Sequence, residues 1–304
     1  LDRSSAASDV YKRQPRSAID AGAVDVVALA GELPEKIARC VEEQSSGARD
    51  GMTAGRLAGT LPQILALVRR TTGHDFSSYK ASTIGRRIAR RMSLHQLHDG
   101  AAYVRYLNET PKEAELLFAE MLIGVTSFFR DADAWQEIEK RVLPPLVARC
   151  PEGTILRAWV PACSTGEEAY SLAIAFREAL EDCVPPKNVT LQIFATDVDR
   201  AAIERARQGT YPSSIAKDVG PERLSRFFLP EGAGFRVRNA VRDHVVFATH
   251  NVLEDPPFTK LDLVSCRNLL IYLSAEIQKS LLTLFHYALL SDGVLFLGLS
   301  LIHI

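Results

Sequence analysis

The sequence predicts a doubly wound α/β domain around a parallel sheet, preceded by an all-α domain. Apolar runs of strand length occur at residues 155–160, 191–195, 245–248 and 261–264, and polar residues follow each run. Helical patterns follow the first two of these runs, as expected for parallel strands joined by crossovers. Upstream, residues 61–123 show apolar positions mainly at helical spacing. With 304 residues, 47% of them hydrophobic, the chain can form about two domains.

The helical region contains one strongly basic segment, residues 80–92. Apolar positions fall along one side of the predicted helix, namely Ala81, Ile84, Ile88 and Met92. The remainder carries Lys80, Arg86, Arg87, Arg90 and Arg91. Such a charge run is usually a solvated face, but it could also attract an acidic partner. The net charge of −1 and the lack of an RNA-binding motif argue against nucleic acid.

A turn of small residues, 161–166, follows the first predicted strand and precedes a helix through Leu180. Small side chains let a ligand approach the backbone, and the first helical turn offers unpaired N–H groups. The turn has one glycine, so it lacks the glycine-rich loop that binds a pyrophosphate. Glu167 and Glu168 either complement the helix dipole, or one of them binds a cationic or hydroxylated ligand.

The second and third strands also end in polar residues. An acid at the tip of a second strand, here Asp197, can accept hydrogen bonds from both hydroxyls of a ribose. Asp199 fits better as the cap of the next helix. Asn251, after residues 245–248, could bind a purine edge or simply make a turn. A ribose without a pyrophosphate favours S-adenosylmethionine.

The last predicted strands are residues 261–264 and 293–298. Cys266, Arg267 and Asn268 follow the first of them and would lie at the ligand edge, although Arg267 and Asn268 could instead end the strand and cap a helix. Earlier in the chain, between the strands predicted at 191–195 and 261–264, residues 235–238 and 245–247 alternate like small strands around a turn.

Five ordered motifs resemble the CheR family, the chemotaxis receptor glutamate methyltransferases. They are FFRD at 128–131, ACSTGEEAYS at 162–171, ATDVD at 195–199, RQGTYP at 207–212 and CRNLLIYL at 266–273. The resemblance covers roughly residues 61–300. It implies a Rossmann-like, S-adenosylmethionine-dependent domain that methylates glutamate carboxylates of a chemoreceptor-type protein, with a small antiparallel β subdomain at about 228–247.

The resemblance also implies roles for individual residues. Arg130 and Tyr272 would be catalytic, lying beside the methyl group, and Asp197 would bind the ribose. The implied cofactor-binding residues are Thr126, Arg130, Glu168, Asp197, Asn251, Val252, Cys266, Arg267 and Asn268. The helical domain would recognise the acidic helical receptor through Lys80, Arg87 and Arg91. The short loop 230–234 suggests that no receptor pentapeptide is needed.

The chain is expected to consist of several segments of different origin. Residues 1–14 and 299–304 look like sequencing-adapter remnants, and residues 15–41 resemble the end of CheB methylesterases, so we expect a fused methylesterase domain. A linker at 42–60, the helical domain at 61–125, a linking segment at 126–143 and the methyltransferase domain at 144–298 follow.

The cysteines, the histidines and the overall hydropathy limit the possible functions. Five cysteines without a CxxC pair and seven scattered histidines argue against disulfides and a metal site. Without a long apolar run, we expect a cytoplasmic protein that does not insert into membranes. The alternative to an enzyme is a non-catalytic S-adenosylmethionine-binding or receptor-adaptor module.

Overall fold

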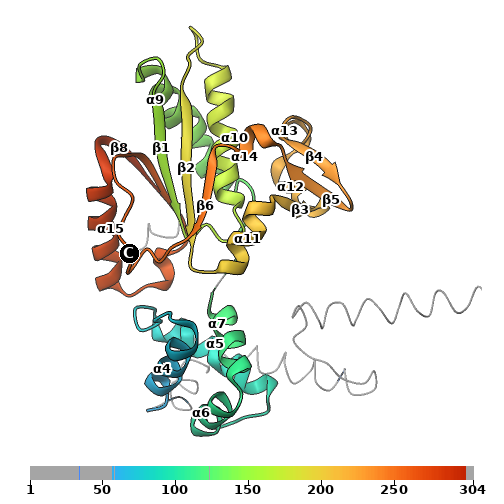
Figure 1. The fold of residues 1–304 in the computed structure, drawn as a ribbon, viewed down its shortest axis with the longest axis vertical. Helices are drawn as coiled ribbons and strands as arrows, with labels where there is room; N and C mark the ends of the chain where they lie inside the picture. The colour runs from blue at the N-terminus through green and yellow to red at the C-terminus, as the bar shows by residue number, and fades with distance from the viewer. Residues whose placement is uncertain (1–33, 35–56, 58, 123, 299–304) are drawn as a thin grey trace, which may run out of the picture. The chain divides into compact units, whose positions relative to one another are not determined.

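The computed structural model describes residues 34, 57, 59–122 and 124–298 of the chain (Figure 1). These residues form two compact units that divide between Met121 and Leu122. The predictions for residues 1–14, 15–41 and 299–304, and for most of the 42–60 linker, fall outside the described residues.

The first unit is all helical. It consists of α4 (Leu61–Thr72), α5 (Ala81–Leu94), α6 (Gly100–Glu109) and α7 (Pro111–Met121). Its core is formed by one apolar stripe from each helix, including Ile64, Ile88, Leu107 and Leu117. The predicted apolar side of α5 is confirmed at Ile84, Ile88 and Met92, whereas Ala81, the first residue of the helix, is exposed.

A buried carboxylate, Glu113, organises the polar interior of this unit. Arg91 donates to both of its oxygens at 2.9 and 2.6 Å, and the Tyr103 hydroxyl donates at 2.8 Å. His95 Nε2 lies 3.0 Å from the same carboxylate. Burial raises the pKa of Glu113, but the hydrogen bonds from Arg91 and Tyr103 outweigh it, and the pKa lies below its ordinary value. Arg91 was expected on a receptor-facing surface; the structure instead gives its guanidinium an internal partner.

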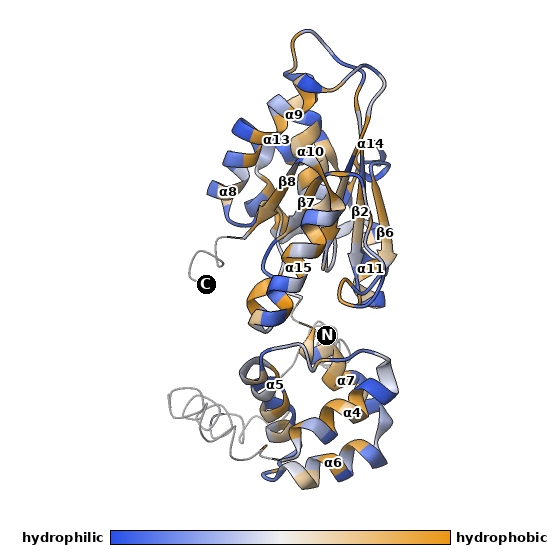
Figure 2. Ribbon diagram, turned by 90° about the vertical axis from the view of Figure 1, so that its left-hand side faces the viewer, coloured by the Kyte–Doolittle hydropathy of each residue, from blue (hydrophilic) through white to orange (hydrophobic). Residues whose placement is uncertain are grey.

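The second unit is built on a five-stranded parallel sheet in the order β6-β2-β1-β7-β8. The strands are β1 (Ile155–Pro161), β2 (Thr190–Asp197), β6 (Val245–Thr249), β7 (Leu261–Cys266) and β8 (Leu289–Leu297). In register, Pro161 lies beside Thr196 and Asp197 beside Thr249. The carboxyl ends of these strands therefore meet at one edge. The strands are coloured mainly toward the hydrophobic end of the scale (Figure 2).

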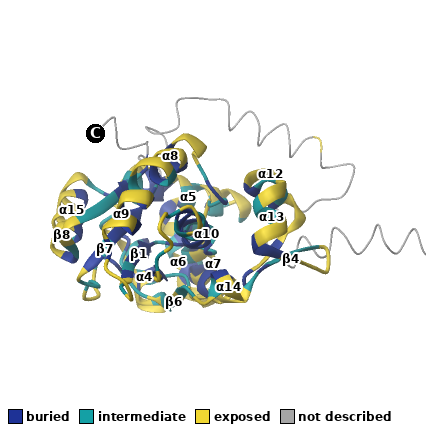
Figure 3. Ribbon diagram, turned by 90° about the horizontal axis from the view of Figure 1, so that it is seen from above, coloured by how far each residue is buried: buried dark blue, intermediate teal, exposed yellow. Residues whose placement is uncertain are grey.

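Alternate residues of β1 identify what covers each face of the sheet. Leu156, Ala158 and Val160 belong to a core shared with α8 (Ala132–Glu137), the π-helical turn η1 (Ile138–Val142), α9 (Leu143–Arg149) and α10 (Glu167–Glu181). Trp159 points the other way, with its ring 5.9 Å from Phe285 of α15 (Ala275–Ala288). Helix α10 is largely buried (Figure 3), and residues 126–143 contribute to the same core through Trp135 and Ile138.

A three-stranded antiparallel sheet lies to one side of the main sheet (Figure 1). Its order is β3 (Thr210–Pro212), β5 (Gly234–Val237) and β4 (Phe228–Glu231). The partner predicted for residues 235–238 was wrong, because residues 245–247 belong to β6 in the main sheet. The helices of this region are α11 (Arg200–Gln208), η2 (Ser213–Ile215), α12 (Ala216–Val219), α13 (Pro221–Phe227) and α14 (Asn239–Arg242).

None of the helices in the part of the chain that the structure describes has the length and apolar character of a membrane span. The same residues contain no group of three or more His, Cys, Asp or Glu side chains that could hold a metal ion.

Candidate functional site

The turn after β1 brings backbone to the carboxyl edge of the sheet. Ala162 and Ser164 have φ values of 56° and 50°, and Gly166 has a φ of 93°. A Cβ atom at Gly166 would lie 2.9 Å from Ala206 Cβ and 3.0 Å from the Phe247 ring. Only glycine fits there, because both the backbone angle and the packing exclude a side chain. The turn can therefore pass close to α11 and β6 and lead directly into α10.

Asp197, at the end of β2, faces this turn. Its carboxylate accepts from the Ser164 N–H and the Asp199 N–H, both at 2.8 Å. Burial is the main influence on its pKa, which is raised. Asp199 instead caps α11 by accepting from the Ala201 and Ala202 N–H groups at 2.8 and 3.1 Å. The capping alternative thus holds for Asp199, and Asp197 is the carboxylate that lies at the rim.

Glu168, in the first turn of α10, links this rim to β7. It accepts a hydrogen bond from Ser265 Oγ at 2.6 Å. Burial raises its pKa to about 7. Glu167 turns to Thr165, whose hydroxyl donates to it at 2.7 Å. Among the described residues neither Glu168 nor Asp197 forms an ion pair, so both carboxylates can still accept from ligand hydroxyl or ammonium groups. This arrangement fits S-adenosylmethionine, which carries both groups.

Arg130 belongs to a short segment held against α10. Its Nη1 donates to the Val125 carbonyl at 2.6 Å, which leaves other N–H donors of the half-buried guanidinium available. One residue earlier, the Phe129 N–H donates to Ser171 Oγ at 3.0 Å. Phe129 has a φ of 49°, so the chain bends sharply at this point.

Arg267 fixes the same segment from the β7 side. Its side chain is 1% exposed, and Nη2 donates to the Arg130 carbonyl at 2.5 Å and to Asp131 Oδ2 at 2.7 Å. The guanidinium carbon lies 5.6 and 5.0 Å from the ring centres of Trp135 and Phe296. Arg267 was expected to complete the cofactor site, partly through its backbone; its side chain binds the Arg130 carbonyl and Asp131.

The remaining predicted site residues differ in their burial and local contacts. Asn251 favours the turn alternative, because its Oδ1 accepts from the Leu253 N–H at 3.1 Å and its amide donates to Glu254 at 2.8 Å. Val252 and Cys266 are buried, and Asn268 has a φ of 61°. Thr126 is half-buried, as is Tyr272 at the end of η3 (Leu270–Tyr272). In the described part of the chain, no side-chain hydrogen bond joins Tyr272 to the others.

Two serines of the site were missed by sequence reasoning. Ser171 holds the Phe129 backbone and Ser265 holds Glu168. Ser171 lies one helical turn after Glu167 and its hydroxyl also donates to the Glu167 carbonyl at 2.7 Å, so helical spacing could have indicated it. Ser265 sits within an apolar strand, where only the alternation of faces singles it out.

Carboxylates at the ends of parallel strands, next to a small-residue turn and a helix N-terminus, define a nucleoside-binding α/β protein. Residues 124–301 match the model of the CheR methyltransferase SAM binding domain, and residues 60–122 match that of the CheR methyltransferase all-alpha domain. The chain therefore belongs to the CheR methyltransferase family. The predicted fold class and the S-adenosylmethionine cofactor are confirmed.

Two relatives match most of this chain. An uncharacterised 104.1 kDa protein of Rhodobacter capsulatus is 44% identical over 83% of this chain, which spans only 26% of that relative. Chemotaxis protein methyltransferase 1 of Pseudomonas aeruginosa is 32% identical, covering 77% of this chain and 86% of its own. A solved TehB-like SAM-dependent methyltransferase from Corynebacterium glutamicum has 15% identity and a TM-score of 0.30, over 55% of this chain and 68% of that chain.

Proposed function

We propose that this chain is a protein-glutamate O-methyltransferase that acts on the acidic helical cytoplasmic domain of a chemoreceptor-type protein. The observation that carries the proposal is the rim of the sheet, where Asp197 and Glu168 keep free acceptors beside a small-residue turn. Asp197 would hold the ribose and Glu168 the other polar groups, while Asn251 and Val252 would border the adenine. S-adenosylmethionine, when bound there, supplies a methyl group on a good leaving group.

The protein's own part in the reaction is positioning. A glutamate carboxylate has an ordinary pKa of about 4.3, so it is already ionised at neutral pH and needs no strong base. In-line attack requires the reacting atoms to be close and aligned, which is worth several kcal/mol when a site arranges it in advance. Arg130 keeps donors free for the substrate carboxylate, because Val125 uses only one of them. Tyr272 would shape the methyl pocket from the other side.

Receptor recognition is assigned to accessible charges at the start of α5 and along it. Lys80 is exposed, and Arg87 lies 3.6 Å from Glu120 with 32% of its side chain accessible. Surface ion pairs of this kind contribute little, so an acidic receptor helix can compete for the arginine. Arg91 is left out of this surface because it pairs with buried Glu113.

A fused methylesterase domain forms part of the proposal. Its supports are the resemblance in residues 15–41 and the much greater length of the Rhodobacter relative.

Transfer of radiolabelled methyl groups to a soluble cytoplasmic chemoreceptor fragment tests the function. Glutamyl methyl esters release volatile methanol in base, so label on glutamate is distinguishable from label on nitrogen. We expect base-labile label with the wild-type chain and a loss of at least about 100-fold with Arg130→Ala. Lys80→Glu with Arg87→Glu should reduce receptor methylation but retain S-adenosylhomocysteine binding. Cofactor binding without any transfer would favour the adaptor alternative.

A further inference from the structure

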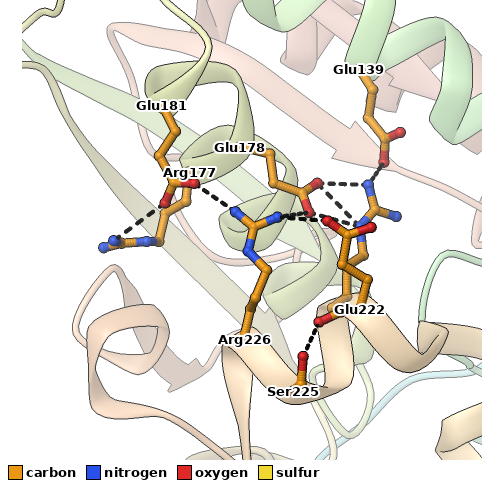
Figure 4. Close-up of polar contacts among 8 residues, drawn as sticks. Glu139, Arg177, Glu178, Glu181, Glu222, Ser225 and Arg226 are labelled. Atoms are coloured by element: carbon orange, nitrogen blue, oxygen red, sulfur yellow. Dashed lines mark hydrogen bonds and ion pairs between the residues drawn. The ribbon is translucent and has the colours of Figure 1, made fainter.

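Two arginines on α13 form ion pairs with two glutamates on α10. Arg226 Nη2 lies 2.5 Å from Glu181, and its Nη1 lies 3.6 Å from Glu178 and 3.5 Å from Glu222 (Figure 4). Arg223, one helical turn earlier, donates to both oxygens of Glu178 at distances from 2.6 to 3.1 Å. The small β subdomain is thereby joined to the helix whose first turn carries Glu168.

Arg223 differs from Arg226 in what else it contacts. Its Nη2 also donates to Glu139 of η1 at 2.7 Å. Its guanidinium carbon lies 4.1 Å from the centre of the Phe129 ring. Arg226 lies over Phe227 instead, on its own helix. Of the two arginines, Arg223 is thus the one that contacts the segment bearing Arg130.

The Phe129 ring is enclosed on more than one side. Trp135 packs edge-on at 5.5 Å, and the ring is buried. The neighbouring Phe128 ring packs on Tyr211 of β3 and Phe228 of β4, at 4.9 and 5.4 Å. The small subdomain therefore supports both phenylalanines that precede Arg130.

We propose that Arg223 is a positioning residue for methyl transfer: its guanidinium, held by Glu178 of α10 and Glu139 of η1, packs on the Phe129 ring and thereby sets the position of Arg130. This inference rests on the proposed function. Three fixed points then define the segment, namely Ser171 on the Phe129 N–H, Arg267 on the Arg130 carbonyl and Arg223 on the Phe129 ring. The two glutamates orient the planar guanidinium, which a lysine could not replace at both of them.

The accessibility of the ion pairs favours a positional over a purely stabilising role. The side chains of Arg223, Glu178 and Glu139 are 24%, 20% and 24% exposed, so water screens their attraction. A cation over an aromatic face, by contrast, has a defined geometry. Displacing a catalytic group by about 1 Å can lower a rate up to about 100-fold.

The test compares Arg223→Gln with Arg226→Gln in the full 304-residue chain. The control variant removes a similar pairing with α10 but leaves Phe129 untouched. Hydrogen exchange of the segment 128–131 is measured first, since it needs no substrate. We expect exchange of the Phe129 amide to become about tenfold faster in Arg223→Gln and to stay unchanged in Arg226→Gln.

Turnover is then measured with labelled S-adenosylmethionine and the soluble chemoreceptor fragment. In Arg223→Gln, kcat should fall about tenfold while the KM for S-adenosylmethionine changes less than about twofold. In a Phe129→Leu background, Arg223→Gln should have little further effect, because the ring through which it acts is gone.

Equal effects of the two glutamine variants, or unchanged exchange in Arg223→Gln, would overturn the inference. A wild-type chain that transfers no methyl group to the fragment would instead count against the proposed function, and the exchange data would still decide whether Arg223 holds the segment.

Discussion

Removing the buried charge of Glu113 should selectively destabilise the helical unit. Its side chain is 2% exposed and that of Arg91 is 14% exposed. Glu113→Gln would leave the Arg91 guanidinium without its anion in a largely dry environment. Breaking a buried pair from one side costs about 3–5 kcal/mol. Partial access of water to Arg91 places the expectation near the lower end, at about 3 kcal/mol.

That loss is large for a unit of this size. At roughly 0.05–0.15 kcal/mol per residue, a domain of about 60 residues has about 3–9 kcal/mol in total. Both tryptophans, Trp135 and Trp159, lie in the second unit. Urea unfolding followed by tryptophan fluorescence should therefore be unchanged, whereas hydrogen exchange in α5 and α7 should become faster by about 100-fold.

The matched control is Glu120→Gln on the same helix. Glu120 pairs with Arg87 and Arg90 at 3.6 and 2.9 Å, where these arginines are 32% and 44% exposed. We expect less than about 1 kcal/mol from it. Because the pKa of Glu113 is lowered in the fold, its contribution is complete above the unfolded-state pKa and is lost as the pH falls through the folded value. A Glu113→Gln protein as stable as the control would refute this reasoning.

Three further outcomes are expected. Burial raises the pKa of Glu168 to about 7, and its carboxylate accepts ligand hydrogen bonds fully only when it is ionised. The affinity for S-adenosylhomocysteine should therefore rise with pH through about 7 and level off above it. Calorimetry with Glu168→Gln should show that this pH dependence is removed. Gly166→Ala should unfold at lower urea concentration, because its Cβ would lie 2.9 Å from Ala206 Cβ at a φ of 93°; an unchanged midpoint would contradict the packing argument. Arg267→Lys should lower kcat about tenfold with nearly unchanged S-adenosylhomocysteine affinity, since it weakens the hydrogen bond to the Arg130 carbonyl. A loss of affinity without a loss of kcat would instead indicate that Arg267 binds the cofactor.

Local patterns were sufficient for the architecture of the second unit. Apolar runs located the five strands, and the cap at Asp199 was predicted from its place before Arg200. The last strand was predicted at 293–298 but begins at Leu289. Its start was missed because Leu290, Ser291 and Asp292 are exposed and lack the pattern of a buried strand, and the pairing with β7 is irregular there. Strand partners depend on register between distant segments, which explains the error at 245–247.

The roles of the arginines could not be predicted in the same way. Arg91 finds Glu113 on another helix, and Arg267 reaches Arg130 and Asp131 across more than a hundred residues of sequence. A basic residue on a predicted helix or after a strand has the same local signature whether it faces solvent, a ligand or a buried carbonyl. Only the packing of Trp135 and Phe296 around Arg267 decides between these alternatives.

The most direct test of the central claim is calorimetric titration of S-adenosylhomocysteine into the full chain, with Asp197→Ala and the capping variant Asp199→Asn alongside. We predict micromolar or tighter binding for the wild type and for Asp199→Asn, and a loss of at least about 100-fold for Asp197→Ala, because only Asp197 faces the turn after β1. Tryptophan fluorescence confirms folding in each case. A folded wild-type chain that does not bind, or an Asp197→Ala chain that binds equally well, would contradict the assignment of the cofactor site.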